Sequence, residues 1–251
     1  MYLLVDAGNS SIKWNIYDST LKQFLLPRQS FLWRTDDLLS LLDQQWRGLN
    51  SIGAVLIANV AGHEVQETVQ QWLSRRQLQA KIINTESNAF GVRNAYKIPA
   101  QLGVDRWLAV LAAANSLPGQ NICTVSCGTA ITVDTVTAAG DHLGGLIIPG
   151  SRMMKKALLQ HTHGVKIAPT EVSWSPFSDS TSAAVNHGVL FAALGFIDRA
   201  IAAIESELDG EVTKMITGGD AQTIREHSRY TFMHEPQLVL KGLALYADEN
   251  T

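Results

Sequence analysis

Residues 3–17 read LLVDAGNSSIKWNIY, in which two runs of largely apolar residues flank a short polar segment. The first run, Leu3 to Val5, has the composition of a buried strand, and Ile12 to Tyr17 alternates as a second strand would. Between them lies Asp6-Ala7-Gly8-Asn9-Ser10, a segment rich in turn-forming residues. The stretch therefore predicts that the chain opens with a β-hairpin.

A second segment of the chain has the same design. Residues 122–136 predict two more strands joined by a polar turn. When the two hairpins are aligned, Val5 falls on Val125 and Gly8 falls on Gly128. This correspondence suggests a duplicated fold and not a tandem repeat array.

The remaining patterns alternate between strands and helices. Residues 53–60 predict a buried strand, residues 63–77 an amphipathic helix, and residues 181–208 one long helix or two abutting helices, interrupted by Gly188 and Gly195. Alternation of this kind indicates an α/β fold. Pro118-Gly119 ends a helical pattern and is the best candidate boundary, so we expect two halves, residues 1–117 and 118–251.

Composition excludes several classes of protein. The 251 residues carry 20 Lys and Arg against 23 Asp and Glu, a net charge of −3, which argues against a general nucleic-acid binder. The longest apolar stretch, Gly188 to Ile197, is much shorter than the roughly 20 residues that cross a bilayer. The N-terminus has no basic region, and the chain has only Cys123 and Cys127, which we expect to be buried on one strand. We therefore expect a cytoplasmic protein with no membrane partner.

The two predicted turns have features of phosphate-binding sites. A glycine-containing turn lets backbone N–H groups converge on a polyanion without a side chain in the way. The first turn adds donors from Asn9, Ser10 and Ser11 and a positive charge from Lys13, and Asp6 could hold magnesium directly or through water. Either turn alone could equally be an ordinary turn. The chain contains neither the Rossmann glycine fingerprint nor a P-loop, so another phosphate-binding architecture is required.

A further candidate is Gly103-Val104-Asp105-Arg106-Trp107, which opens a predicted helix. An acid in the first turn of a helix offsets the helix dipole, and this is one reading of Asp105. The other reading is catalytic: Asp105 accepts a proton from a substrate hydroxyl, and Arg106 pairs with a phosphate or carboxylate. A phosphotransferase needs both groups.

Several of these segments together resemble the type III pantothenate kinases. The resemblance runs nearly from end to end and rests on Asp6 to Trp14, Tyr96, Gly103 to Arg106, Gly128 to Asp134, Gly144 to Gly150, and Thr181 to Gly188. It implies a fold of the superfamily of acetate and sugar kinases, heat-shock chaperones and actin, with two ribonuclease-H-like halves and a nucleotide cleft between them. The first half would carry the phosphate-binding hairpin and the catalytic Asp. The second would carry the second phosphate loop and the substrate and adenosine side.

The resemblance also implies the reaction and the residues that carry it. The family transfers the γ-phosphate of ATP to pantothenate and forms 4′-phosphopantothenate, the first step towards coenzyme A. By resemblance, ATP and Mg²⁺ would be bound by Asp6, Ala7, Gly8, Asn9, Ser10, Ser11, Ile12 and Lys13, with Asp6 as the metal ligand and Thr129 as a further ATP contact. Asp105 would be the proton acceptor, and the pantothenate pocket would be lined by Tyr96, Gly103, Val104, Asp105, Arg106 and Thr181.

Family members are cytoplasmic homodimers that use a monovalent cation, K⁺ or NH₄⁺. Many of them have Asp, a ligand of that cation, where this chain has Ser126. Because a neutral hydroxyl stands there, we expect the cation site to be weak, rebuilt from other oxygens, or absent. Two other functions stay open: a kinase of a sugar or short acid, and a non-catalytic nucleotide-binding regulator with the same fold.

Overall fold

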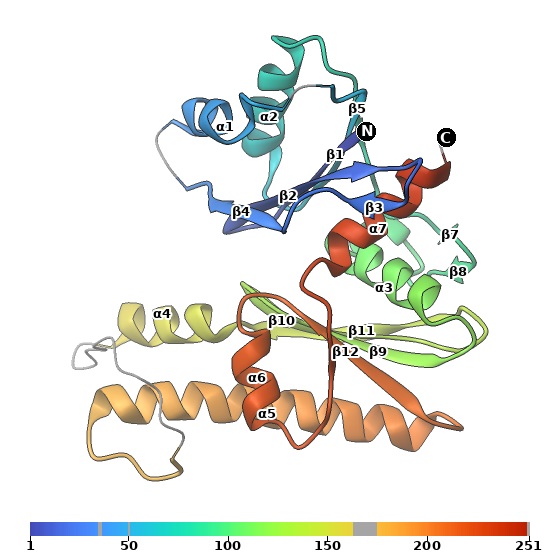
Figure 1. The fold of residues 1–251 in the computed structure, drawn as a ribbon. Coiled ribbons are helices and arrows are strands. Elements are labelled where there is room, and N and C mark those ends of the chain that lie inside the picture. The colour runs from blue at the N-terminus through green and yellow to red at the C-terminus, as the bar shows by residue number, and fades with distance from the viewer. Residues whose placement is uncertain (35–36, 50, 163–174, 250–251) are drawn as a thin grey trace. The chain divides into compact units, whose positions relative to one another are not determined.

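The computed structural model describes residues 1–34, 37–49, 51–162 and 175–249. The chain folds into two compact units, each shown in Figure 1. The first unit comprises Met1–Pro118, Gly140–His142 and Pro236–Thr251, and the second comprises Gly119–Ala139 and Leu143–Glu235.

The division of the chain differs from the expected one in a specific way. The first long segment ends at Pro118, next to the boundary expected after residue 117. The sequence-based division placed all of residues 118–251 in the second half, whereas Gly140–His142 and the segment from Pro236 onward lie with the first unit. The physical reason at the C-terminal end is packing, because α7 (Leu238–Glu249) contacts both β1 (Tyr2–Ala7) and α3 (Val104–Ser116).

The first unit is built on a mixed sheet whose strand order is β3-β2-β1-β5-β6, with β4 also paired to β2. The remaining strands of this sheet are β2 (Ser11–Asp18), β3 (Gln23–Phe24), β4 (Gln29–Leu32), β5 (Ala54–Asn59) and β6 (Ala80–Ile82). β1 and β2 pair antiparallel with Ala7 opposite Ile12, which confirms the hairpin predicted at the start of the chain. β1 also pairs in parallel with β5, and a separate two-stranded ribbon joins β7 (Asn88–Ala89) to β8 (Val92–Arg93).

Helices cover this sheet on both faces (Figure 1). On one face, α1 (Leu38–Trp46) and α2 (His63–Ser74) share a buried cluster with β1, β2 and β5. The Asp37 carboxylate caps α1 by accepting a hydrogen bond from the Ser40 N–H at 3.0 Å. On the other face, α7 approaches α3 so closely at Gly242 that a side chain there would collide with the backbone carbonyl of Leu108. A short 3₁₀ helix, Pro99–Gln101, precedes α3.

The second unit has a sheet with the order β11-β10-β9-β12-β13. Its strands are β9 (Asn121–Cys127), β10 (Ala130–Val136), β11 (His142–Pro149), β12 (Val212–Thr217) and β13 (Met233–His234), and its helices are α4 (Ser151–His161), α5 (Thr181–Glu207) and α6 (Ala221–His227). β9 and β10 pair antiparallel with Cys127 opposite Ile131, and β9 pairs in parallel with β12. Both units thus contain an antiparallel hairpin beside a parallel strand, as expected of a duplicated fold.

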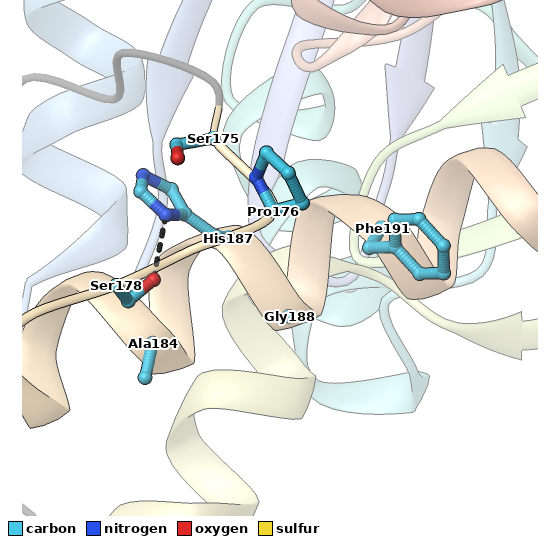
Figure 2. Close-up of a pocket in the computed structure, with 7 residues that line it drawn as sticks. All are labelled: Ser175, Pro176, Ser178, Ala184, His187, Gly188 and Phe191. Atoms are coloured by element: carbon cyan, nitrogen blue, oxygen red, sulfur yellow. Dashed lines mark hydrogen bonds between the residues drawn. The ribbon is translucent and has the colours of Figure 1, made fainter.

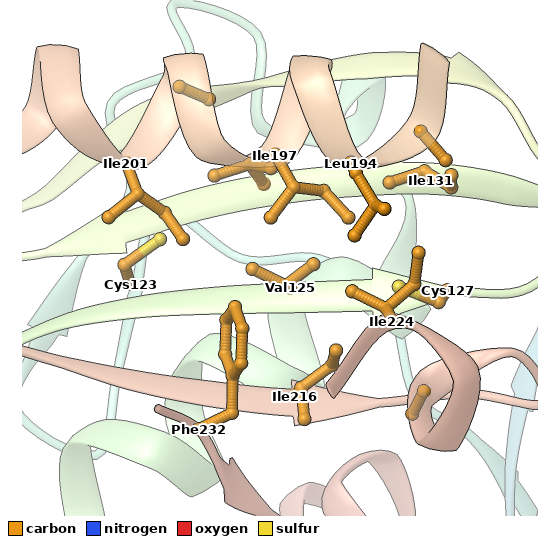
Figure 3. Packing of buried hydrophobic residues seen from close by; sticks show 14 of the residues in the cluster. Cys123, Val125, Cys127, Ile131, Leu194, Ile197, Ile201, Ile216, Ile224 and Phe232 are labelled. Carbon is orange, nitrogen blue, oxygen red and sulfur yellow. The ribbon is translucent and has the colours of Figure 1, made fainter. Parts of the chain in front are cut away.

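The core of the second unit lies between its sheet and α5 (Figure 3). Side chains from alternate positions of β9 face apolar side chains that α5 presents at helical spacing, including Leu194, Ile197 and Ile201. Cys123 and Cys127 lie in this cluster as free, fully buried thiols, which confirms their predicted place on one strand. Burial is the largest cause that raises the pKa of each thiol to about 12, so both stay protonated near neutral pH.

The long helical pattern forms one continuous helix, α5, and not two. Gly188 and Gly195 are exposed, and a side chain at either position would meet no atom within 4 Å. Among the described helices, α5 alone has the length and apolar composition of a membrane-spanning segment, with an 18-residue window that is 39% buried. The whole of α5 is thus long enough to cross a bilayer, whereas its continuous apolar stretch, Gly188 to Ile197, is too short. One face of α5 packs on the sheet, as the core helix of a water-soluble domain does.

Candidate functional site

The turn of the first hairpin is held by its own backbone. The Gly8 N–H donates to the Ser11 carbonyl at 3.0 Å. The side chains of Ala7 and Ile12 on either side are buried in the core, and so is that of Val104 at the start of α3. Of the residues expected to contact ligand, these three could therefore do so only through their backbone.

Polar and charged groups surround this turn. Asn9 is exposed, and Ser10 and Ser11 are half-buried. The Asp6 side chain is almost fully buried and accepts a hydrogen bond from Lys13 Nζ at 3.0 Å, which also makes an ion pair. The two residues lie directly opposite each other in the β1–β2 register, so the hairpin itself sets their contact. The Lys13 charge is therefore balanced locally by Asp6.

Asp105 lies in the first turn of α3, as predicted. Its Oδ1 accepts the backbone N–H of Arg106 at 2.9 Å. Desolvation raises the pKa of the Asp105 carboxyl above 3.8, and the nearby charge of Asp6 raises it further, against the weaker opposing effects of Lys13 and Arg106. The residue before the helix is Gly103, and an added Cβ there would lie 2.7 Å from Asp105 Oδ1 and displace this oxygen. The first unit thus holds a carboxylate of increased basicity close to the turn.

The next side chains form a stacked group. Arg106 Nη1 donates to the Tyr96 hydroxyl at 3.2 Å, and its guanidinium carbon lies 6.0 Å from the Tyr96 ring centre. The Tyr96 ring stacks on His142 with centroids 6.2 Å apart and an interplanar angle of 16°. His142 is 2% exposed and also meets the edge of Trp107, with centroids 6.4 Å apart. Tyr96 is therefore fixed from two sides, by Arg106 and by His142.

The segment that carries His142 is tied to the first unit by several contacts. The Arg93 N–H donates to the Gly140 carbonyl at 2.8 Å, and Arg93 Nε donates to Asp141 Oδ1 at 2.6 Å. Gly140 has a φ of +83° and lies against the Gly91 backbone, so the position favours glycine on both counts. These contacts explain why Gly140–His142 belongs with the first unit.

The turn of the second hairpin is braced by backbone from two later segments. The Gly150 N–H donates to the Thr129 carbonyl at 2.9 Å, and the Asp220 N–H donates to the Cys127 carbonyl at 3.1 Å. Gly218 has a φ of +103° and packs against the Cys127 backbone. The Gly218-Gly219 pair therefore lies beside the second predicted phosphate turn. Thr129 itself is half-buried.

Thr181 occupies the first position of α5 and is exposed. The preceding residue, Ser180, caps the helix by accepting the Ala183 N–H at 3.3 Å. Near this end of α5 lies a hollow of about 450 Å³, lined by Ser175, Pro176, Ser178, Ala184, His187, Gly188 and Phe191. Figure 2 shows the His187 ring turned toward the Ser178 hydroxyl, and His187 Nδ1 lies 2.8 Å from Ser178 Oγ. The hollow contains none of the expected site residues, so we do not equate it with the candidate site.

The predicted residues thus fall into two groups. Asp6 to Lys13, Tyr96 and Gly103 to Arg106 gather in the first unit, whereas Thr129 and Thr181 belong to the second. Sequence reasoning missed His142, because its contact with Tyr96 depends on a segment distant in sequence. It also missed Trp33 and Arg34, which follow β4 and donate to the backbone of the first turn. A tryptophan and an arginine after a short strand do not indicate, from sequence alone, that their side chains contact the backbone of a turn.

Comparison with known proteins identifies the family. The family model for type III pantothenate kinase matches residues 2–203. The chain belongs to the type III pantothenate kinase family. A type III pantothenate kinase of Nitrosococcus oceani is 40% identical over 256 residues, with 100% of this chain and 95% of the relative covered. The type III pantothenate kinase of Janthinobacterium sp. is 34% identical, with 100% of this chain and 99% of the relative covered.

Solved structures agree with this family at the level of the fold. A protein of Sinorhizobium meliloti described as a 2-dehydro-3-deoxygalactonokinase superposes with a TM-score of 0.62 over 100% of this chain and 99% of its own. The sequences are only 14% identical, so the likeness concerns the fold alone. The fold of this pantothenate kinase family member is thus the α/β fold with two ribonuclease-H-like halves that the resemblance implied.

Proposed function

We propose that the chain transfers the γ-phosphate of ATP to the primary hydroxyl of pantothenate and forms 4′-phosphopantothenate and ADP. Family membership supports this activity. The observation that carries it is the grouping of Asp105, Arg106 and Tyr96 near the Asp6–Lys13 pair. Phosphoryl transfer depends mainly on positioning and on neutralising charge, and this grouping supplies an oriented carboxylate and two cationic side chains.

Asp105 is the proposed proton acceptor. As the pantothenate hydroxyl oxygen bonds to the γ-phosphorus and ADP leaves, the hydroxyl proton passes to the Asp105 carboxylate. The raised pKa of Asp105 makes its carboxylate a stronger base than that of an exposed aspartate. The Arg106 N–H holds one carboxylate oxygen at 2.9 Å, which fixes the direction of the acceptor.

The chemistry of Asp6 fits magnesium. Mg²⁺ prefers oxygen ligands and is usually held by one or two carboxylates together with phosphate oxygens and water. Asp6 supplies a nearly buried carboxylate beside the turn, and no group of three or more His, Cys, Asp or Glu gathers among the residues that the structure describes. Asp6 would therefore hold the ion with the substrate's own phosphates. Bound there, magnesium would neutralise charge on the transferring phosphate.

The substrate side of the site is assigned to Tyr96, Arg106 and Thr181. The Arg106 guanidinium can pair with the carboxylate of pantothenate, and Tyr96 holds that guanidinium by its hydroxyl. Thr181 is exposed at the start of α5 and offers a hydroxyl and the N-terminus of a helix. Gly103 and the Val104 backbone would complete the wall next to Asp105. Thr129 would contact ATP from the second turn.

We further propose a homodimer that forms through the second unit. Its surface exposes large apolar side chains, among them Leu146, Ile147, Phe177 and Phe191. Ala184, Gly188, Phe191 and Gly195 are exposed along α5 at spacings of three and four residues, so they lie on one exposed face of this helix. Small residues at such spacing permit the close approach of a second helix. A second copy of the chain is the proposed cover.

The monovalent-cation site is proposed to be lost or unselective. Ser126 pairs with Thr132 on β10 and with Thr217 on β12, so hydroxyl side chains surround the position where many relatives have a carboxylate. Neutral hydroxyls bind K⁺ or NH₄⁺ less strongly than a carboxylate does. We therefore expect similar rates in sodium and in potassium buffer.

We assign the enzyme to the cytoplasm, with no membrane or nucleic-acid partner. Both cysteines are free and buried, as is usual in a reducing compartment. The net charge of −3 gives no support for binding a polyanion over a broad surface. One face of α5 is occupied by the core of the second unit.

The decisive experiment follows 4′-phosphopantothenate formation by the purified protein with ATP and MgCl₂, with and without pantothenate, in sodium and in potassium buffer. Pantothenate-dependent product supports the proposal, and equal rates in the two buffers support loss of cation selectivity. Product in potassium alone would mean that other oxygens have rebuilt the cation site. Preference for a sugar in a panel of hydroxyl substrates would contradict pantothenate as the substrate and favour the sugar or acid kinase. Nucleotide binding without any turnover would contradict the kinase assignment and favour the regulator.

A further inference from the structure

Two residues of another segment donate hydrogen bonds to the turn between β1 and β2. Trp33 Nε1 donates to the Gly8 carbonyl at 2.6 Å. Arg34 donates to the Asn9 carbonyl from Nε at 3.4 Å and from Nη2 at 3.3 Å. Two consecutive side chains thus hold two consecutive carbonyls of the turn.

The pairing of β4 with β2 places Trp33 and Arg34 next to the turn. β4 pairs with β2 with Leu32 opposite Ser11, so the chain leaves β4 directly beside the turn. The Trp33 ring packs against the core cluster of the first unit, and the Arg34 guanidinium lies 5.4 Å from the Trp33 ring centre. The indole donor therefore directly follows a paired strand, and its ring is held against the core.

These hydrogen bonds determine the direction of the backbone N–H groups of the turn. In a trans peptide the C=O and the following N–H point in opposite directions, and the described chain has no cis peptide bond. With the Gly8 and Asn9 carbonyls turned toward Trp33 and Arg34, the N–H groups of Asn9 and Ser10 point away from them. Carbonyl oxygens repel a phosphate and N–H groups attract it. The same two hydrogen bonds therefore remove the repulsive groups from one side of the turn and present the attractive ones.

Arg34 also changes the charge around the turn. Lys13 is balanced by Asp6 at 3.0 Å, and Arg106 lies next to Asp105 in sequence and in space. Arg34 is exposed and contacts a neutral carbonyl on the turn. It therefore adds positive charge beside the turn, which favours the approach of a polyanion.

We infer that Trp33 and Arg34 are positioning residues for the phosphates of a nucleoside triphosphate, acting through the Gly8–Asn9–Ser10 backbone. The inference rests on the proposed function only in that ATP is the ligand of this turn. Both residues contact the turn and neither is among those assigned to pantothenate, so we expect their effect to fall on nucleotide binding.

The test measures binding of AMP-PNP with MgCl₂ by calorimetric titration, and the KM of each substrate. Trp33→Phe keeps an aromatic ring, although a smaller one, and removes the donor. We expect its Kd for AMP-PNP to rise about threefold to tenfold, the effect of one lost hydrogen bond. Arg34→Gln should raise this Kd similarly, and Arg34→Lys should recover part of the loss. The KM for ATP should rise with the Kd, while the KM for pantothenate stays within about twofold of wild type.

Matched controls come from the same unit. Trp72 Nε1 donates to Asp43 Oδ1 at 3.1 Å, and Arg28 Nη1 donates to the Pro236 carbonyl at 3.0 Å. Trp72→Phe and Arg28→Gln remove the same kinds of donor away from the turn and should leave the AMP-PNP affinity unchanged. An equal loss in these controls would overturn the inference, since the effect would then be one of general packing.

The remaining outcomes are separable. Wild-type affinity in both Trp33→Phe and Arg34→Gln overturns the inference, and if Trp33→Phe does not fold, the exposed Arg34 decides alone. A wild-type protein that binds AMP-PNP but makes no 4′-phosphopantothenate overturns the proposed function and leaves the positioning test intact. A wild-type protein that binds no AMP-PNP overturns both.

Discussion

Asp105 is the residue on which the proposed chemistry depends most directly. Asp105→Asn keeps the size of the side chain and an oxygen that can accept the Arg106 N–H, but it cannot take up a proton. We expect kcat to fall at least about 100-fold, the typical contribution of a general base, with the KM for ATP little changed. Steady-state kinetics of the folded variant would check this. Turnover near that of wild type would remove Asp105 from the role of proton acceptor.

The same substitution should increase stability, because the Asp105 charge is held in an unfavourable place. Its pKa in the folded protein is raised above 3.8, chiefly by desolvation and then by Asp6. Between the unfolded and folded pKa values the native state binds more protons than the unfolded state, so this group's contribution to stability falls as pH rises through that interval. The neutral amide of Asp105→Asn avoids this loss.

We therefore expect Asp105→Asn to unfold at a higher temperature than wild type at pH 7. The difference should shrink as pH falls toward 3.8, where the carboxyl becomes protonated in both states. Thermal unfolding of both proteins across this pH range is the measurement. A variant that is less stable at pH 7 would show that the contacts of Asp105 with Lys13 and Arg106 outweigh its desolvation. The wild-type Asp105 would then favour both stability and activity, with no trade-off between the two.

At the scale of elements, the second turn depends on a close backbone approach. Gly218 has a φ of +103°, and a Cβ there would collide with the Cys127 backbone. We expect Gly218→Ala to destabilise the protein by about 2 kcal/mol or more and to raise the KM for ATP by displacing the turn that carries Thr129. Denaturant unfolding and ATP kinetics would measure both effects.

The neighbouring glycine is a matched control for this prediction. A Cβ at Gly219 would meet no atom within 4 Å, and its φ lies outside the positive range. Gly219→Ala should leave both stability and the KM for ATP close to wild type. If both substitutions are tolerated equally, the close contact of Gly218 does not hold the turn in place.

The elements themselves were largely predictable from local sequence. The hairpin of residues 2–18 and the strand Val212–Thr217 follow from alternation and from turn residues, which are local signals. Local sequence does not decide between one helix and two over residues 181–208, because Gly188 and Gly195 lower helix propensity. Continuous packing on the sheet favours one helix. The start of α5 could also be placed by its cap, Ser180.

The site was predictable only where the sequence keeps its members close together. Asp6 and Lys13 face each other in one hairpin, and Asp105 and Arg106 are neighbours, so local patterns indicate both pairs. The contact of His142 with Tyr96 joins segments far apart in the chain, and so does that of Trp33 with Gly8. Such contacts depend on tertiary packing, which no local pattern encodes.

At the scale of the whole molecule, the proposed dimer makes a direct prediction. Phe191 is 63% exposed on the face of α5 proposed for the dimer, and an acid there would be buried in a dimer without a partner of opposite charge. We expect wild type to have about twice the 27.4 kDa mass of one chain and Phe191→Asp to be monomeric, as measured by light scattering after gel filtration. Pantothenate phosphorylation should fall with it if Thr181 acts across the interface.

A control for this prediction lies on the first unit. Leu21 is 62% exposed, nearly the same as Phe191, and is remote from α5 in sequence. Leu21→Asp should leave the mass of the assembly unchanged. A monomeric wild type, or a dimer that survives Phe191→Asp, would contradict the assignment of this face.

The position of α7 has a consequence for how the protein is made. β1 is synthesised before the second unit, whereas α7, the helix that packs on β1, is synthesised after it. The part of the first sheet that α7 covers therefore stays exposed while the entire second unit is translated. A nascent chain with such an exposed face is a natural client for chaperones that bind apolar segments, and slow elongation would prolong that exposure.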